Sequence, residues 1–82
     1  MTVQEHGENR GRTVAFGEML KSRRVKSELT QVQLADKLSV TGPLISQYES
    51  GKRLPSTRIL SRIRRALDLS ADEFAFMMDV VE

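Results

Sequence analysis

The apolar positions of this chain recur at helical spacing, and no segment shows the strict alternation typical of a strand. The helical pattern begins at Thr13, and Phe16 and Leu20 lie on one face of this first segment. Leu29 closes it. Because the pattern breaks at residues 27–28, we predict that the chain turns there.

Two short helices follow in the pattern. The first covers about residues 31–38, and the hydroxyl of Thr30 can accept from the free amides of its first turn. The second runs from residue 42 or 43 to about Ser50. Thr41 can cap its start, and Gly51 is typical of its end. The residues predicted to face inward are Leu34, Ala35, Leu38, Leu44, Ile45 and Tyr48.

Two more helices complete the chain. Ser56 can cap the fourth helix, and Ser70 with Glu73 has the spacing of a capping box that starts the fifth, which runs to about Val80. The inward stripe of the fourth helix consists of Ile59, Leu60, Ile63, Ala66 and Leu67. We therefore predict an all-α domain of five helices over residues 13–82.

Residues 1–12, MTVQEHGENRGR, contain two glycines and no apolar period. We predict a flexible N-terminal arm there. The chain has no cysteine, which removes disulfides and thiolate metal ligands, and no apolar run approaches the ~20 residues that a membrane span needs. A cytoplasmic protein without a metal, a cofactor or a membrane partner is the simplest interpretation.

Charge is distributed unevenly along the chain, although the formal net charge is only +2. All 13 Lys and Arg residues lie between positions 10 and 65. The last 17 residues, from position 66, carry five carboxylates and no Lys or Arg. A basic body with an acidic C-terminal end indicates either a polyanionic partner for the body or a solvated surface that is simply basic.

Three sequence words then occur in order: LTQVQLADKLSVT from Leu29, ISQYESGKRLPS from Ile45, and ILSRIRRALDLSADEF from Ile59. In these words the chain resembles the lambda-repressor-like helix-turn-helix family of phage repressors and Cro proteins. The resemblance implies a five-helix DNA-binding domain that acts as a repressor-like transcription regulator. It also implies an ion pair between Arg24 and Glu49. The residues alone also allow two solvated charges, but the pair is favoured because a lone buried charge is costly and these two residues are natural complements.

The physical properties of the segment agree with that resemblance. Two short helices joined by a turn of three or four residues cross steeply, and Ala35 supplies the small side chain needed where they approach. The second helix can then enter the major groove. The first lies across the backbone, where Gln31 and the nearby amides can meet a phosphate.

The first two positions of the predicted recognition helix, Gly42 and Pro43, depart from the family pattern because neither side chain can form a hydrogen bond. Close approach of the backbone with Pro43 or Leu44 on a thymine methyl, readout by other polar residues, and readout of DNA shape are all open. Gln47 is the first candidate for a base contact, although it also fits an exposed helix position. The full set of predicted DNA contacts is Gln31, Thr41, Gly42, Pro43, Leu44, Ser46, Gln47, Ser50, Lys52 and Arg53.

The fifth predicted helix is more apolar than a surface helix requires, and its apolar residues lie on more than one face. One face can cover the core of the domain, and another can form a two-fold homodimer interface. The predicted interface residues are Phe74, Phe76, Met77, Met78, Val80 and Val81. The alternative is that all of them belong to the core.

An enzyme is not expected, because the chain has one histidine, His6, and no Gly-rich phosphate loop or metal-ligand cluster. The sequence favours a homodimer that binds a two-half-site operator in double-stranded DNA. An antitoxin and a restriction–modification controller protein of the same fold remain alternatives. A protein-interaction module that does not bind DNA is the main alternative from another class.

Overall fold

A computed structural model describes the backbone of residues 2–81 and the side chains of residues 11–81. Within that range the chain forms five helices and no strand. They are α1 (Thr2–Lys26), α2 (Gln31–Leu38), α3 (Gly42–Glu49), α4 (Thr57–Leu67) and α5 (Ala71–Val81). The predicted all-α, five-helix fold is confirmed.

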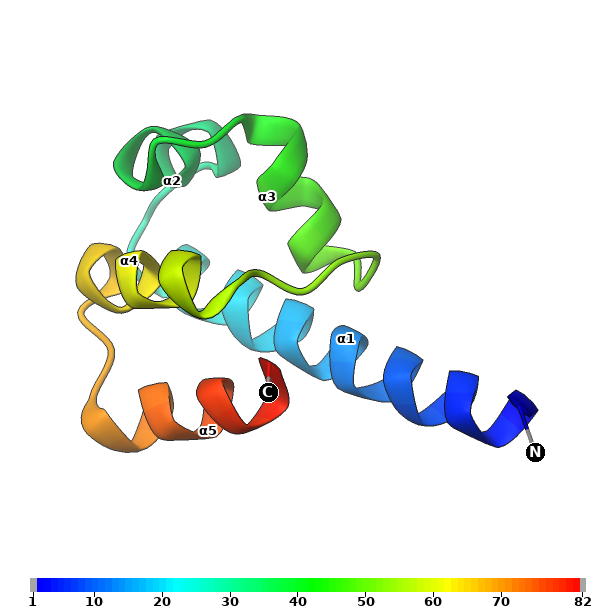
Figure 1. The fold of residues 1–82 in the computed structure, drawn as a ribbon. Helices are drawn as coiled ribbons and strands as arrows, with labels where there is room; N and C mark the ends of the chain where they lie inside the picture. The colour runs from blue at the N-terminus through cyan, green and yellow to red at the C-terminus, as the bar shows by residue number, and fades with distance from the viewer. Residues whose placement is uncertain (1, 82) are drawn as a thin grey trace.

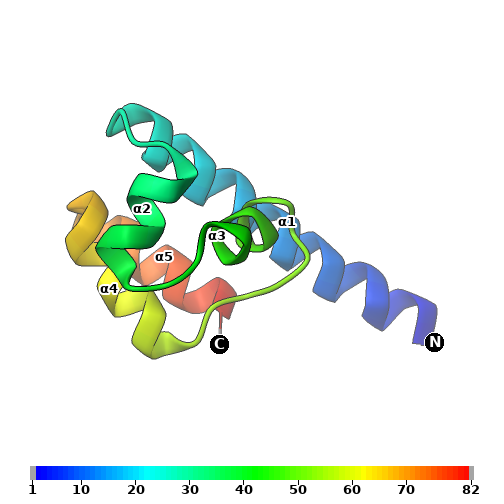
Figure 2. The same cartoon turned by 90° about the horizontal axis from the view of Figure 1, so that it is seen from above.

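Helix α1 lies at the centre of the arrangement (Figure 1). Helices α2 and α3 lie on one side of it and α5 lies on the other. Helix α4 packs against both α2 and α5 and so connects the two sides. Seen from the side of α2 and α3, these two helices lie in front of the rest of the domain, and the N-terminal turns of α1 project beyond it (Figure 2). The pair α2–α3 therefore forms one outer layer of the molecule.

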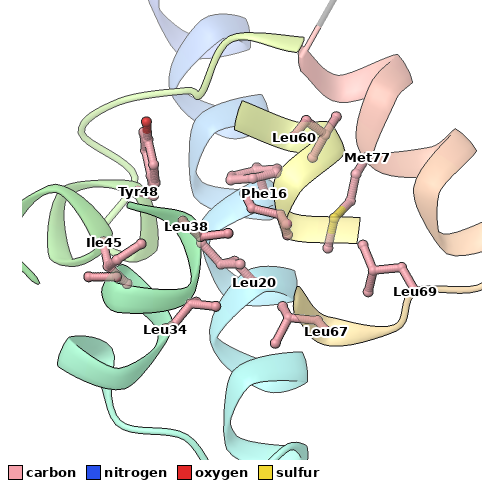
Figure 3. Close-up of a cluster of buried hydrophobic side chains, with 12 residues drawn as sticks. Phe16, Leu20, Leu34, Leu38, Ile45, Tyr48, Leu60, Leu67, Leu69 and Met77 are labelled. Carbon is pink, nitrogen blue, oxygen red and sulfur yellow. The ribbon is translucent and has the colours of Figure 1, made fainter. Parts of the chain in front are cut away.

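All five helices contribute to one apolar core, whose central side chains have no solvent exposure (Figure 3). Phe16 and Leu20 supply the α1 stripe that the sequence predicts, and the ring of Phe16 meets Tyr48 edge-on at a centroid distance of 6.5 Å. The other buried apolar residues are Leu34, Ala35, Leu38, Ile45, Leu60, Ile63, Leu67, Leu69 and Met77. Because these residues come from every helix, the position of α3 depends on the packing of the whole domain.

The predicted starts of the second to fifth helices, α2 to α5, are confirmed. The hydroxyls of Thr30, Thr41 and Ser56 accept from backbone N–H groups in the first turns of α2, α3 and α4. Ser70 and Glu73 form the predicted capping box, with distances of 2.9 and 3.1 Å between donor and acceptor. A second capping box, between Thr30 and Gln33, was not predicted, although its spacing is the same.

Four helices end in the same way, with a left-handed residue followed by a backbone hydrogen bond that spans five residues. Glu28, Ser39 and Asp68 have φ values of 60°, 58° and 53° after α1, α2 and α4. Gly51 has a φ of 80° after α3. The backbone N–H groups of the next residues donate to Arg24, Ala35, Gln47 and Arg64. This is the Schellman motif, which satisfies carbonyl groups at the helix end.

The start of α1 differs from the prediction. Its backbone is helical from Thr2, whereas the sequence pattern places the first helical residue at Thr13. Adding a residue to a helix that already exists is far easier than nucleating one, so a polar segment can continue a helix that packing fixes elsewhere. An apolar period is therefore not required there. The division of the chain at residue 12 stays a prediction.

Candidate nucleic-acid interface

Helices α2 and α3 are joined by the three residues 39–41, and this turn gives the pair its helix-turn-helix form. Val40 is half-buried against the core and fixes the turn from inside. Ala35 is 1% exposed, in agreement with its predicted place on the inner side of α2. The turn and both helix starts thus follow the positions predicted from the sequence.

Helix α3 has a buried side and an exposed side. Ile45 and Tyr48 are buried, and Leu44 is half-buried against the core. On the opposite side Pro43, Ser46, Gln47 and Ser50 are exposed. These four positions have the spacing i, i+3, i+4 and i+7, so they form one row along the helix, which we call the outer row. Helix α3 therefore presents a continuous face to its surroundings.

An ion pair and a network of hydrogen bonds fix the C-terminal end of α3. The structure brings Arg24 and Glu49 together, with Arg24 Nε 2.6 Å and Nη2 3.1 Å from the two carboxylate oxygens. Their side chains are 11% and 4% exposed. Arg24 Nη1 also donates to the carbonyl of Leu29, at 2.7 Å. A bidentate geometry of this kind is strong and directional, and it holds α3 against the end of α1.

Gln31 belongs to the same network. Its Nε2 donates to Glu49 Oε1 at 3.0 Å, which links the start of α2 to the end of α3. The sequence assigns Gln31 to a phosphate contact. The structure instead gives one of its amide hydrogens a partner within the chain, and the phosphate contact stays a prediction.

Helices α1 and α3 approach each other closely at Gly17, a residue that the sequence reasoning missed. A Cβ atom there would lie 2.5 Å from the carbonyl oxygen of Glu49 and 2.6 Å from that of Tyr48. Only glycine fits this contact, because both obstacles are backbone atoms. The available signal was a glycine inside a helical pattern without a capping role.

The loop after α3 is shaped by Gly51 and carries the predicted basic residues. A Cβ atom at Gly51 would lie 2.9 Å from Val14 Cγ2, so α1 also crowds this position. Lys52 and Arg53 are exposed beside the end of α3. Burial raises the pKa of Tyr48 above 10.0, while the positive charge of Arg53 acts in the opposite direction. Tyr48 is thus a neutral core residue with a cationic neighbour.

The N-terminal end of α3 is less polar than its middle. Gly42 is half-buried and has no side chain, and Pro43 is exposed. The nearest atom to a Cβ built at Gly42 is Val32 Cγ2, at 3.5 Å. Val32, on α2, is 62% exposed. Thr41 is exposed next to this group, with its hydroxyl engaged in the helix cap.

Helix α5 corrects one predicted interface residue. Met77 is 1% exposed and belongs to the core of its own chain, because it lies on the side of α5 that packs against α1. Phe76 is 55% exposed. The remaining predicted interface residues, Phe74, Met78, Val80 and Val81, are half-buried and pack against the core.

Several arginines have partners within the chain. Arg62 donates to the carbonyl of Leu38 at the end of α2, and Arg12 donates to that of Asp79. Arg64 lies 4.7 Å from the centre of the Phe74 ring, a cation–π distance. Arginines that the charge distribution alone assigns to a polyanion thus also join helices.

Among the described residues there is no cluster of three or more His, Cys, Asp or Glu side chains that could hold a metal ion. In the same part of the chain, no helix has the length and apolar character of a membrane span.

A comparison with known protein families identifies the family to which this chain belongs. The helix-turn-helix family matches residues 20–74, which contain α2, α3 and α4 and parts of their neighbours. The chain belongs to this family. The resemblance to the phage repressor and Cro type, drawn from three sequence words, is thereby confirmed.

Curated relatives are similar over most of this chain but extend well beyond it. YqaE of Bacillus subtilis, an uncharacterised helix-turn-helix-type transcriptional regulator, is 44% identical over 57 residues, 70% of this chain and 49% of that protein. Human endothelial differentiation-related factor 1 is 35% identical over 57 residues, 70% of this chain and 38% of that protein. The chain thus spans about half or less of their length.

Two solved structures share the fold. The restriction–modification controller protein C.AhdI of Aeromonas hydrophila gives a TM-score of 0.73 at 26% identity, covering 79% of this chain and 94% of that chain. The clp gene regulator ClgR of C. glutamicum gives a TM-score of 0.72 at 25% identity, covering 87% and 92%. This family member therefore shares its architecture with regulators from different settings.

Proposed function

We propose that this helix-turn-helix protein is a cytoplasmic, repressor-like transcription regulator that binds double-stranded DNA. The observation that carries the proposal is the outer row of α3, Pro43, Ser46, Gln47 and Ser50, which is exposed along the whole helix. The major groove is wide enough for one helix. A helix with one buried and one free side can lie in that groove without disturbing the core.

In this proposal the outer row contacts base edges and the flanking groups contact the DNA backbone. Gln47 binds a base, since a glutamine can form two hydrogen bonds with adenine. Lys52, Arg53 and Ser50 meet phosphates beside the end of α3, and Thr41 and Gln31 meet them near the starts of α3 and α2. Gly42 and Leu44 are both half-buried, and in this proposal they contribute at the edge of this surface, Gly42 through its backbone and Leu44 through the exposed part of its side chain.

The test is selection of bound sequences from a pool of random duplexes, followed by titration at several salt concentrations. A regulator yields one enriched sequence, and its affinity falls with salt because phosphate contacts release counterions. Gln47→Ala changes the enriched sequence or removes a position from it. Lys52→Ala is the matched contrast, since it weakens all duplexes alike and lowers the salt slope by about one. Equal binding to every duplex in all three proteins would contradict the proposal.

The homodimer is the second part of the proposal, and it is supported by the exposure of Phe76 on α5. A large aromatic side chain that is half-exposed beside half-buried apolar neighbours is typical of an association surface. Dimers read two half-sites about one helical turn apart, which explains how a short helix gains specificity. The proposed interface consists of Phe74, Phe76, Met78, Val80 and Val81.

Sedimentation equilibrium with and without the selected duplex tests this interface. The native chain is expected to be a dimer at micromolar concentration, and Phe76→Glu a folded monomer. Val25→Glu serves as the control, because Val25 is similarly exposed on α1. A native chain that stays monomeric, even on DNA, would exclude the dimer while leaving DNA binding intact.

A protein-interaction module is the second candidate function. Relatives named multiprotein-bridging factor 1 occur in Candida albicans, at 33% identity, and in Arabidopsis thaliana, at 46% for the factor named 1a. Their name refers to bridging between proteins. If no duplex binds in the selection experiment at low salt, this second function becomes the better explanation of the fold.

A further inference from the structure

The corner between the start of α2 and the start of α3 is apolar and open. Val32 is 62% exposed, the most exposed of the large apolar side chains described. Its Cγ2 atom lies beside Gly42, where the absence of a side chain leaves its methyl group uncovered. Pro43 is exposed at the next position. The side chains of Val32 and Pro43 can neither donate nor accept a hydrogen bond, and Gly42 has no side chain.

This corner adjoins the outer row. Pro43 is the first member of that row and also borders Gly42. Gly42, Ser46 and Glu49 stand at i, i+4 and i+7, so they share the side of α3 that faces the start of α2. The hydrogen bond from Gln31 to Glu49 and the nearness of Val32 to Gly42 agree with that arrangement. Val32 therefore lies at the edge of the face that the proposed function places in the major groove.

The C5 methyl of thymine is the one apolar substituent that projects from the base edges into the major groove, where cytosine has only a C5 hydrogen. The hydrogen-bond donors and acceptors on these edges lose their water against Val32 without gaining a partner. Accepting the proposed function, we infer that Val32, with Gly42 and Pro43, forms a seat for a thymine methyl and makes this corner specific for thymine. Gly42 contributes by allowing the base edge to approach the backbone.

The inference assigns a role to a residue of α2, outside the recognition helix. It also explains why a regulator can have Gly-Pro where polar side chains would otherwise read bases. Here the apolar corner reads the methyl group, while Gln47 and Ser46 supply the polar contacts further along the row. The specificity surface thus includes both helices of the pair.

Deoxyuridine tests this seat directly, because it differs from thymidine only in lacking the C5 methyl. The probe is the duplex enriched in the selection experiment, synthesised with deoxyuridine at each thymine position in turn. We expect one position in each half-site where the substitution lowers affinity about fourfold, the effect of burying one methyl group less. The remaining positions change less.

The same duplexes are then titrated with Val32→Ala and with the control Val25→Ala, whose residue is 56% exposed on α1. Val32→Ala should weaken the thymine duplex and bind the deoxyuridine duplex as well as the thymine one, whereas the control behaves like the native chain. Circular dichroism melts confirm that both variants fold, as expected for exposed positions.

Two outcomes overturn the inference while the proposed function stands. Either no deoxyuridine substitution affects a duplex that binds specifically, or the fourfold loss persists unchanged in Val32→Ala. Failure of every duplex to bind removes the proposed function itself, and the thymine seat with it. Gly42→Ala provides a second test. Its Cβ makes an ordinary 3.5 Å contact with Val32, so the substitution leaves the fold intact. Gly42→Ala should reduce the preference for thymine, because the added methyl group occupies the space through which the base edge approaches the backbone.

Discussion

Removing the carboxylate of Glu49 should destabilise the domain more than most single changes. Its oxygens accept from Arg24 Nε at 2.6 Å, from Arg24 Nη2 at 3.1 Å and from Gln31 Nε2 at 3.0 Å. In Glu49→Ala the Arg24 charge, only 11% exposed, keeps a single partner, the carbonyl of Leu29. Breaking a buried pair by deleting one member costs about 3–5 kcal/mol.

That loss is large for a domain of this length. A small domain has about 5–15 kcal/mol of total stability, so near the middle of that range the variant loses about a third to a half of it. Each kcal/mol lowers the melting temperature of a 60–100-residue domain by about 4–8 °C. Glu49→Ala is therefore expected to melt at least about 12 °C below the native chain.

The assay is thermal and urea unfolding followed by circular dichroism, with three comparison variants. Glu49→Gln retains the shape of the side chain and should lose less stability than Glu49→Ala. The double variant Arg24→Met with Glu49→Leu removes both charges and should recover much of the loss, because no buried charge is left alone. Arg24→Ala measures the complementary loss, in which the Glu49 carboxylate is left without its charged partner. A melting temperature of Glu49→Ala within a few degrees of the native value would refute the reasoning.

Three further predictions concern other parts of the fold. The pKa of Glu73 is lowered, chiefly by the backbone N–H of Ser70, with Arg23 adding to the effect. Its ionised form therefore stabilises the fold above the ordinary Glu pKa of about 4.3 and the contribution is lost as pH falls through the lower folded value. The difference in melting temperature between the native chain and Glu73→Gln should be present at pH 7 and shrink towards pH 3; a constant difference would contradict this. Glu28→Gly should stabilise by about 1 kcal/mol in urea unfolding, since φ is 60° there and glycine avoids the left-handed cost; an equal gain in Glu28→Ala would point to another cause. Gly17→Ala should lower the free energy of unfolding by about 1–3 kcal/mol or more, because the added methyl group meets backbone oxygens of α3. An unchanged free energy of unfolding would show that α1 and α3 can move apart at this contact without cost.

Much of the fold follows from local rules that act within a few residues. The caps at Thr30, Thr41 and Ser56 each depend on a hydroxyl that accepts from a nearby amide, so spacing alone places the helix starts. The inner stripes follow from helical period. The ends are harder to predict where the left-handed residue is not glycine, as at Ser39 and Asp68.

The candidate site also has one part that the sequence predicts and another part that it does not. The outer row could be predicted, because the inward residues Ile45 and Tyr48 fix which side of α3 is free. Two features could not. The tight contact at Gly17 and the exposed methyl of Val32 beside Gly42 depend on how helices cross, and no local pattern encodes a crossing. The helical start of α1 at Thr2 also lay outside prediction, since its residues lack the apolar period that packing imposes.

The anchoring of α3 leaves its exposed positions free to vary. Everything that fixes the helix lies on its inner side or at its ends: the backbone contact at Gly17, the Arg24–Glu49 network and the buried side chains. None of these groups belongs to the outer row. Relatives can therefore differ at those four positions without altering how the helix packs against the rest of the domain. For protein engineering, the domain is a scaffold on which new target preferences can be installed by replacing surface side chains alone.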